Sequence, residues 1–389
     1  MYPETDENFF KENYIKGSTS VSNNVFERKL FDGFKIVCGE HNFTFLSAPS
    51  FGWYPFNCKK MVIKGRTDSH IYHHVQYIST YFGSAFSKTH SFKKQLSKVC
   101  KDLNSNNTKV CLVINELHLP YLECAKYMKK KYKNVSVVQL VPDLPQHNNR
   151  SKSFIYKLLK KINCTKIEKL RLKFVDKYVL FSLPMADKLE ITNKNNWIVN
   201  YGIAPKKHDF GLTKNSSKVK HIVFIGKIDN RNGIDLIIKV AEKFRGQTDI
   251  VFDLYGIGAS DAFNQETIKN NNIVVHGFLT PSKVQEILSN ADVLLSPRYP
   301  AEEYTKYSFP SKIFEYLATD VPIVTFKLEC YPRDLDSLLI YPKDINAESL
   351  FDSVNLALRT KVDLDARKRF LSNFSEEAVV KKIMELCDV

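Results

Sequence analysis

The sequence has no long apolar run and no hydrophobic leader. No window approaches the roughly 18 consecutive apolar residues that a membrane-spanning helix requires, which excludes a helical integral membrane protein. The first ten residues, MYPETDENFF, are acidic and contain no apolar core, so we do not expect a signal peptide. Both absences favour a protein of the cytoplasm.

The eight cysteines form no CxxC pair. This absence argues against structural zinc and favours a reducing compartment. Several cysteines, such as Cys111 in VCLVI, lie in apolar runs, and we expect these to be small core residues. They are scattered along the chain, at Cys38, Cys58, Cys100, Cys111, Cys124, Cys164, Cys330 and Cys387.

Two phosphate-binding fingerprints are also missing. No Walker-type Gly-Lys-Ser/Thr occurs, which argues against a P-loop. The segment DLYGIG, residues 253–258, lacks the third glycine of a dinucleotide site. Small residues at a strand end still allow a backbone to approach a ligand, so Gly256 and Gly258 are candidates for binding.

Negative charge is scarce, because 57 Lys and Arg residues face 42 Asp and Glu residues, a formal charge of +15. Nucleic acid, anionic lipid and a phosphorylated substrate are the three partners that such a charge suggests. The alternative is a lysine-rich composition without a function. We do not expect nucleic acid, because no reader motif is present and the basic clusters lack interleaved aromatic residues.

Short β-rich runs alternate with helical stretches throughout the chain. The runs are continuously apolar and β-branched, which is typical of strands buried on both faces of a parallel sheet. Two such series in 389 residues predict an α/β fold of two facing doubly wound, Rossmann-like domains. The predicted strands are 43–48, 75–80, 110–116, 135–141, 177–182 and 197–202, then 221–226, 250–256, 273–278, 291–297, 322–327 and 338–342.

A segment rich in Gly, Pro, Ser and Lys, residues 202–220, separates the two series and is the predicted linker. We therefore expect an N-terminal domain over 1–202 and a C-terminal domain over 203–372. Residues 373–389 form a final helical stretch that ends the fold or crosses back to the first domain. Residues 1–25 hold no apolar strand, so the first strand is either missing from this chain or lies upstream.

The segment SFPSKIFE, residues 308–315, concentrates polar groups at a predicted helix start. Ser308 is the expected N-cap, and Pro310 suits the first turn. Lys312 is badly placed for the helix dipole unless a phosphate lies between it and the helix end. Glu315 falls on the same face, where a carboxylate can accept two ribose hydroxyls. The alternative is a surface Lys312–Glu315 pair.

A second cationic segment follows the strand of the run FIGKIDNRNG, residues 224–233. Lys227 and Arg231 lie in this glycine turn, at the sheet edge where open parallel sheets bind ligands. Two cations beside an anion-ready helix start suit a diphosphate. The predicted binding residues are Gly226, Lys227, Arg231, Gly256, Gly258, Ser308, Ser311, Lys312 and Glu315.

The second half resembles the nucleotide-binding domain of GT-B fold glycosyltransferases, in particular family 4. The resemblance rests on IVFIGKIDNRNGIDLII, FDLYGIG, VVHGFLTPSKVQEILSNADVLLSPR and EEYTKYSFPSKIFEYLATDVPIVTFK, which cover about 221–330. It implies that Lys227 and Lys312 hold the donor diphosphate, with Arg231 beside them, and that Glu315 binds the ribose. The motifs TKYSFPSK and DLP are most similar to a narrower group of bacterial capsule and exopolysaccharide transferases.

The first half resembles the acceptor domain of the same family more loosely, through SVSNNVFERKLFDGF, VQLVPDLPQ and KYVLFSLPMADKL. The resemblance places a substrate loop at Ser20 and Asn23, which we expect to bind the acceptor. Asp143, at a strand end, is the candidate base or sugar-orienting group; the alternative is an Asx turn before Pro145. Glu116 and His118 are further acceptor-side candidates, against helix capping and ordinary surface.

The chain departs from the family at three positions. Tyr307 stands where a Glu often precedes the ribose-binding residue by eight positions, and Pro142 stands where a His usually precedes the Asp. Asn232-Gly233 replaces the usual Lys-Gly. These departures concern the catalytic group and the stereochemistry, while the donor class follows from the cations.

Two segments, 151–174 and 126–134, are strongly basic. The first of them also carries apolar residues at helical spacing. A basic amphipathic helix is typical of membrane-surface binding, whereas a solvated lysine face over a buried apolar stripe is the alternative. Asp68, His70, His73 and His74 are close in sequence, but we expect a loop there rather than a metal site.

These features predict a metal-independent hexosyltransferase without a cofactor. It would move a sugar from a nucleotide-diphosphate donor, such as a UDP-sugar, to a glycan or lipid-linked glycan on the inner face of the cell membrane. Lys227, Lys312 and Arg231 would stabilise the departing diphosphate. The alternatives are a non-catalytic scaffold of polysaccharide assembly and a nucleotide-sugar epimerase of the same fold.

Overall fold

The structure is a computed structural model that describes residues 12–13, 21–49, 51–69, 71–81, 83–101, 108–145, 154–206, 218–258, 272–277, 279 and 281–387. The chain divides into two compact units. The N-terminal unit comprises Tyr2–Ile203 together with Glu376–Val389, and the C-terminal unit comprises Ala204–Ser375. The predicted boundaries were 202/203 and 372/373, and most of the predicted linker lies outside the described residues.

The N-terminal unit is built on a four-stranded parallel sheet in the order β6-β7-β8-β9. Its strands are β6 (Val110–Asn115), β7 (Val135–Val141), β8 (Lys177–Leu180) and β9 (Trp197–Val199). In β7 six of the seven residues are buried, as expected for a central strand covered on both faces. The predicted parallel α/β architecture is confirmed for this sheet.

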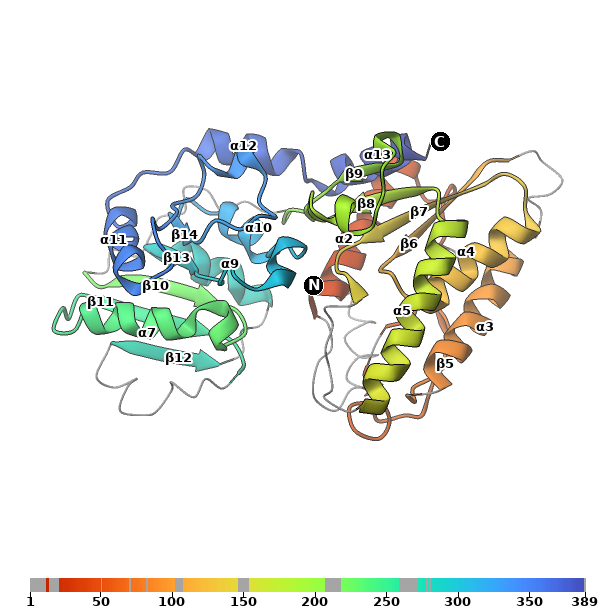
Figure 1. The fold of residues 1–389 in the computed structure, drawn as a ribbon, viewed down its shortest axis with the longest axis horizontal. Coiled ribbons are helices and arrows are strands. Elements are labelled where there is room, and N and C mark those ends of the chain that lie inside the picture. The colour runs from red at the N-terminus through yellow and green to blue at the C-terminus, as the bar shows by residue number, and fades with distance from the viewer. Residues whose placement is uncertain are drawn as a thin grey trace. The chain divides into compact units, whose positions relative to one another are not determined.

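Three helices, α3 (Gly83–Val99), α4 (Leu119–Lys131) and α5 (Phe154–Phe174), lie side by side in the order α3-α4-α5 (Figure 1). Glu123 of α4 forms ion pairs with Lys93 of α3 at 3.4 Å and with Lys166 of α5 at 3.7 Å. All three helices begin near the carboxyl edge of the sheet, because each connects to a strand that starts at the opposite edge. Short helices α6 (Met185–Lys188) and η2 (Lys194–Asn196) complete this part.

Residues 45–78 do not join the parallel sheet. They form a three-stranded mixed sheet, β1-β4-β3, and a two-stranded antiparallel pair, β2-β5. The strands are β1 (Phe45–Ser47), β2 (Val62–Ile63), β3 (Arg66–Ser69), β4 (Tyr72–His74) and β5 (Tyr77–Ile78). The expected loop at Asp68–His74 was therefore wrong for its described residues, which pair as the hairpin β3–β4.

The C-terminal helix α13 (Glu376–Leu386) packs against α2 (Val21–Cys38) within the N-terminal unit. Gly33 permits this contact, because a Cβ there would lie 2.5 Å from the Glu376 carbonyl oxygen. A disulfide joins Cys111 of β6 to Cys387 at the end of α13. We expected Cys111 to be a small core residue, but it is only partly buried and is paired with a second cysteine, because α13 folds back beside β6.

The C-terminal unit contains a five-stranded parallel sheet in the order β12-β11-β10-β13-β14. Its strands are β10 (Lys220–Ile225), β11 (Ile250–Tyr255), β12 (Ile273–Gly277), β13 (Val293–Ser296) and β14 (Ile323–Thr325). After β10, strands β11 and β12 are added in turn on one side of it. Strands β13 and β14 are then added on the other side of β10. The order reverses between β10 and β13, which makes that point the topological switch point.

Helices cover this sheet and close its core. They are η3 (Asn230–Asn232), α7 (Ile234–Lys243), α9 (Pro281–Asn290), η4 (Glu303–Lys306), α10 (Lys312–Leu317), η5 (Arg333–Leu335), α11 (Ala347–Ala357) and α12 (Leu364–Ser372). Phe244 and Phe252 meet in the core between α7 and β11. The strand predicted at 338–342 was wrong, since only an isolated bridge between Ile340 and Val324 forms there.

Candidate functional site

The switch point of the C-terminal sheet brings the predicted donor residues together. Gly226 follows β10 directly, Arg298 lies two residues after β13, and α10 begins 14 residues beyond Arg298. In open parallel sheets the crevice outside the carboxyl ends at such a point is where ligands bind. The fold therefore brings polar residues from three separate segments to the carboxyl edge of this sheet.

Glycines allow the loops after β10 and β11 to lie backbone against backbone. Gly256 has a φ of +153°, and a Cβ there would approach the Gly226 carbonyl oxygen to 1.7 Å. At Gly258, with φ +156°, a Cβ would lie 2.1 Å from the Ile228 oxygen. These glycines thus serve the contact between two loops, and through it they fix the backbone that carries Lys227.

The turn that carries Lys227 and Arg231 is held by its own side chains. The Asp229 carboxylate accepts a hydrogen bond from the Asn232 backbone N–H at 3.2 Å, and the Asn232 side chain donates to the Lys227 carbonyl at 2.9 Å. Gly233, with φ +76°, approaches the Pro297 carbonyl too closely for any Cβ. The Asn232-Gly233 pair is therefore a structural clamp for this turn.

Lys227 itself is 73% exposed and forms an ion pair with Asp229 at 3.0 Å. Arg231 is also exposed, on the next turn of the same loop. Two exposed cationic side chains on a hydrogen-bonded turn can reach an anion without deforming the backbone. Exposure also means that the Lys227–Asp229 pair is worth little by itself, on the order of 0–1 kcal/mol.

The helix that carries Lys312 begins later than the sequence predicts. Ser311 is its N-cap residue, without a side-chain capping bond, and Ser308 lies outside the helix. The prediction of Ser308 as N-cap was wrong because Pro310 and Ser311 already form tight turns, in which their carbonyls accept from Ile313 and Phe314. The Ser308 carbonyl instead accepts a hydrogen bond from the Arg298 guanidinium at 3.3 Å.

Lys312 and Glu315 lie on one face of α10, and their side chains bond at 2.7 Å. Each side chain is about one-third exposed, so both remain accessible to a ligand. The ion pair that the sequence offered as an alternative is thus present. It does not conflict with binding, because a diphosphate can replace the carboxylate as the partner of Lys312.

Tyr316 fixes α10 at the switch point, a role that sequence reasoning missed. Its hydroxyl accepts from the Ile225 N–H at 3.0 Å and donates to the Leu295 carbonyl at 3.3 Å, bridging β10 and β13. Burial raises the pKa of the Tyr316 phenol well above its usual range, so it stays protonated. In the sequence, a tyrosine within an apolar helical segment indicates only that the residue is buried, and not what its hydroxyl binds.

In the N-terminal unit the acceptor-side candidates follow two adjacent strands. Asp143 comes two residues after β7 and is exposed, while Glu116 directly follows β6 with a left-handed backbone, φ +62°. His118 occupies the N-cap position of α4, but its side chain makes no capping bond there. Ser20 lies outside the described residues; Asn23 lies in α2, where only its backbone is described.

Glu116 lies within a cluster of ionisable groups. The sequence did not predict this cluster. Burial and the charge of Glu116 raise the pKa of Glu27, on α2, to about 7. Burial lowers the pKa of Lys88, on α3, to about 8, opposed by the two carboxylates. Ser47 donates to the Glu27 carboxylate at 3.4 Å. Perturbed groups of this kind, at the carboxyl edge of a parallel sheet, mark a candidate site.

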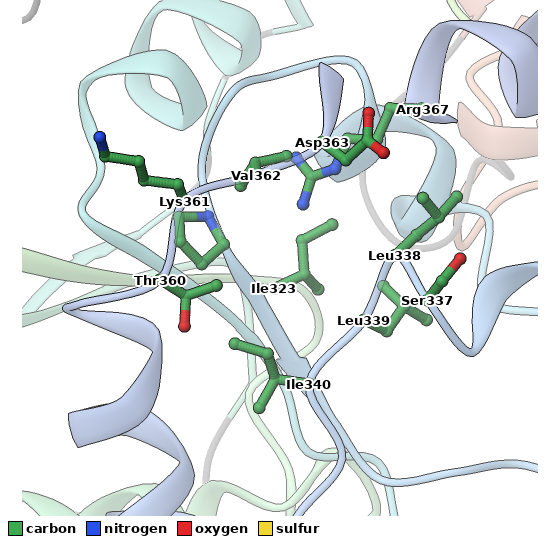
Figure 2. A pocket seen from close by; sticks show the side chains of 11 residues that line it. Ile323, Ser337, Leu338, Leu339, Ile340, Thr360, Lys361, Val362, Asp363 and Arg367 are labelled. Atoms are coloured by element: carbon green, nitrogen blue, oxygen red, sulfur yellow. The ribbon is translucent and has the colours of Figure 1, made fainter. Parts of the chain in front are cut away.

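A pocket in the C-terminal unit lies away from the predicted donor residues. Figure 2 shows its lining, which comes from the start of β14, from 337–340, from 360–363 and from Arg367. The start of a parallel strand belongs to the sheet edge opposite the carboxyl ends. Arg367 is buried beside it and donates to the carbonyls of Thr319 and Val321, a structural role. Among the described residues no His, Cys, Asp and Glu group could hold a metal ion.

Comparison with known proteins gives a family match on the C-terminal unit. Residues 219–359, most of the C-terminal unit, match the family described as Glycosyl transferases group 1. The chain is 28% identical over 146 residues to alpha-galactosylglucosyldiacylglycerol synthase of Streptococcus pneumoniae strain ATCC BAA-255 / R6. That match spans 36% of this chain and 37% of the relative's length.

Solved structures extend the likeness to both units. Sucrose-phosphate synthase from Thermosynechococcus elongatus superposes with a TM-score of 0.58 at 14% identity, over 94% of this chain and 92% of that one. The lipopolysaccharide outer core galactosyltransferase WaaB gives 0.54 at 15% identity, over 78% and 79%. The resemblance to GT-B fold glycosyltransferases is confirmed; the narrower likeness to capsule transferases stays a prediction.

Proposed function

We propose that this chain with a GT-B glycosyltransferase fold transfers a sugar from a nucleotide-diphosphate donor, a UDP-sugar, to a glycan or lipid-linked glycan. One observation carries the proposal. Lys227 and Arg231 from the turn after β10 and Lys312 from the start of α10 lie at one switch point, beside the carboxylate of Glu315. Cations with an adjacent carboxylate match the diphosphate and ribose of a nucleotide.

The side chains, rather than the helix dipole, would supply the electrostatic stabilisation. The helix α10 has only six residues, so its aligned peptide dipoles are few. When the bond between sugar and phosphate breaks, negative charge grows on the diphosphate. Lys312, Lys227 and Arg231 would stabilise that charge without a metal ion or other cofactor.

The acceptor would bind to the N-terminal unit. Asp143 and Glu116 follow two adjacent parallel strands, and a carboxylate there can orient a sugar hydroxyl or take its proton. Glu27 joins these candidates because a pKa near neutrality suits proton transfer. His118, Ser20 and Asn23 remain proposed acceptor contacts.

The acceptor is proposed to lie at an anionic membrane surface, which α5 would contact. Along α5, Lys and Arg occur at seven positions and an acid only at Glu168. A buried apolar stripe under a solvated lysine face would hide Leu158 and Ile162, but these are 50% and 58% exposed. Exposed apolar residues among lysines favour an interfacial helix. No helix among the described residues meets the length and hydropathy of a membrane span.

Two relatives act on lipid-borne glycans by their names, one a diacylglycerol glycolipid synthase and one a lipopolysaccharide galactosyltransferase. These names support a lipid-linked or cell-surface glycan acceptor. We therefore place the protein in surface polysaccharide or glycolipid synthesis, peripheral to the inner face of the cell membrane.

The deciding experiment incubates the purified chain with a panel of nucleotide sugars, with and without membrane extract, and measures released nucleotide. A transferase releases nucleotide, and the release rises when the extract supplies an acceptor. Interconversion of donor sugars without acceptor would instead identify an epimerase. No turnover with any donor, together with no nucleotide binding, would leave only a scaffold and reject the proposal.

A further inference from the structure

We infer that a lobe of the N-terminal unit, residues 51–63, 77–81 and 83–87, inserts aromatic side chains into the interface of an anionic lipid bilayer. We call this region the aromatic lobe. The inference deepens the proposed membrane association and rests on that part of the proposed function. It does not depend on which sugar is transferred.

The aromatic lobe exposes an unusual amount of apolar surface. Eight of the nineteen exposed large apolar side chains in the described chain lie between residues 53 and 86, which is less than a tenth of the sequence. Phe56 is 73% exposed and Phe86 is 80% exposed. The full set is Trp53, Tyr54, Phe56, Met61, Val62, Ile78, Tyr81 and Phe86. Apolar patches of this kind mark interaction sites.

Direct contacts tie several of these side chains and their segments together. The rings of Trp53 and Tyr81 meet edge to face at 4.7 Å. Val62 and Ile78 are partners across the β2–β5 pair, so they share a face. The lobe then joins the first turn of α3, because the Ile78 N–H donates to the Ser87 hydroxyl at 2.9 Å.

The lobe is folded around a core of its own, so its exposed residues are not those of a loose loop. Phe51, Ile63 and Tyr77 are almost completely buried beneath it. The Ser79 hydroxyl donates to the Gly52 carbonyl at 2.7 Å, and its N–H donates to the Met61 carbonyl at 2.7 Å. Phe56 and Phe86 are therefore exposed on the surface of a folded, hydrogen-bonded region that has buried side chains beneath it.

The exposed end of α5 lies on the same side as the lobe. The ion pairs of Glu123 set Lys93 of α3 level with Lys166 of α5. Both helices run the same way, so Phe86 lies about 10 Å beyond that level and Leu158 about 12 Å beyond it, at 1.5 Å per residue. Aromatic lobe and α5 therefore extend from the carboxyl edge of the sheet in the same direction, as the helices in Figure 1 show.

Charge identifies the partner. The aromatic lobe contains Lys59 and Lys60 and no acidic residue, and α5 contains seven Lys and Arg residues and one acidic residue. Lysines around exposed aromatic residues match a bilayer with anionic headgroups, where Trp, Tyr and Phe occupy the interface. A second copy of the chain would bring like charge to the same surface, and an uncharged glycan would not use the lysines.

The test measures co-sedimentation of the full chain with vesicles of phosphatidylglycerol and phosphatidylethanolamine, without donor or acceptor. Phe56→Ser combined with Phe86→Ser should weaken binding at least tenfold. Leu356→Ser, which removes an apolar side chain exposed to 57% in the C-terminal unit, should bind as the wild type does. Unchanged far-UV circular dichroism and thermal unfolding of both variants show that they fold.

A second measurement locates the lobe in the bilayer. In a Trp197→Phe background Trp53 is the remaining tryptophan, and brominated lipid should quench its fluorescence. Wild-type vesicle binding by the double variant, or unquenched Trp53 in bound protein, overturns the inference. So does light scattering that shows a dimer which the double variant abolishes. Loss of nucleotide turnover with intact vesicle binding would count against the proposed reaction alone.

Discussion

Lys312 Nζ and Glu315 Oε2 lie 2.7 Å apart on the first turn of α10, at the switch point of the C-terminal sheet. The two residues proposed to bind different parts of the donor thus bond to each other in the free protein. The pair holds the carboxylate beside the ammonium group. Donor binding would separate their tasks, with the diphosphate taking Lys312 and the ribose taking Glu315.

Removal of the Lys312 ammonium should weaken UDP binding. A charge-assisted hydrogen bond contributes about 1.5–3 kcal/mol, so Lys312→Ala should raise the Kd roughly 10- to 150-fold. Isothermal titration measures the change. Lys327→Ala is the matched control, because Lys327 is an exposed lysine of the same unit that pairs with Asp336 at 2.7 Å. Equal affinity of wild type and Lys312→Ala would refute the phosphate role.

Glu315 should provide the preference for ribose. Titration of UDP and of its 2′-deoxy analogue should show a preference for UDP in the wild type, because the carboxylate accepts a hydroxyl hydrogen bond. In Glu315→Gln we expect that preference to shrink about tenfold, as one charge-assisted bond is replaced by a neutral one. A preference that survives unchanged in the variant would assign ribose binding to another residue.

The close approach of the two glycine loops should be visible in stability. Gly256→Ala places a Cβ 1.7 Å from the Gly226 oxygen, so the loops must separate, and we expect a loss of about 2–4 kcal/mol in unfolding free energy. Gly246→Ala is the control, since Gly246 also has a positive φ, +88°, but no atom within 4 Å of the Cβ. It should cost about 1 kcal/mol. Chemical denaturation that gives equal losses for both would contradict this contact.

The Glu27 cluster predicts a dependence of stability on pH. The pKa of Glu27 rises from 4.5 to about 7 on folding, so the folded state holds a proton that the unfolded state releases. Its contribution is fully present below pH 4.5 and is lost as the pH rises to about 7. As the pH rises from 5 to 8, the unfolding free energy of Glu27→Gln should increase by about 1–3 kcal/mol relative to that of the wild type. Parallel curves of unfolding free energy against pH would exclude a raised pKa.

Strand positions were the part of the fold most open to prediction. The runs 135–141 and 250–256 are continuous and apolar, and they became the central strands β7 and β11. Residues 75–80 gave only the two-residue strand β5, because that region pairs locally and is not covered on both faces. Apolar pattern predicts burial, but it does not determine which neighbour a strand takes.

Polar residues at strand ends could be found from the sequence, whereas contacts across the chain could not. Lys227 and Lys312 were visible because each opens a helical segment after a β-rich run. Three contacts depend on residues far apart in sequence. They are the hydrogen bonds of Tyr316 that link α10 to two strands, the Glu27–Lys88 cluster and the Cys111–Cys387 disulfide. No local pattern marks such pairs.

The most direct test is a crystal structure of the chain soaked with UDP or a UDP-sugar. The account predicts that the diphosphate lies within hydrogen-bonding distance of Lys312 Nζ and of Lys227 or Arg231, with the ribose hydroxyls at the Glu315 carboxylate. Phosphates bound at any other part of the chain, with these four side chains unchanged, would contradict it.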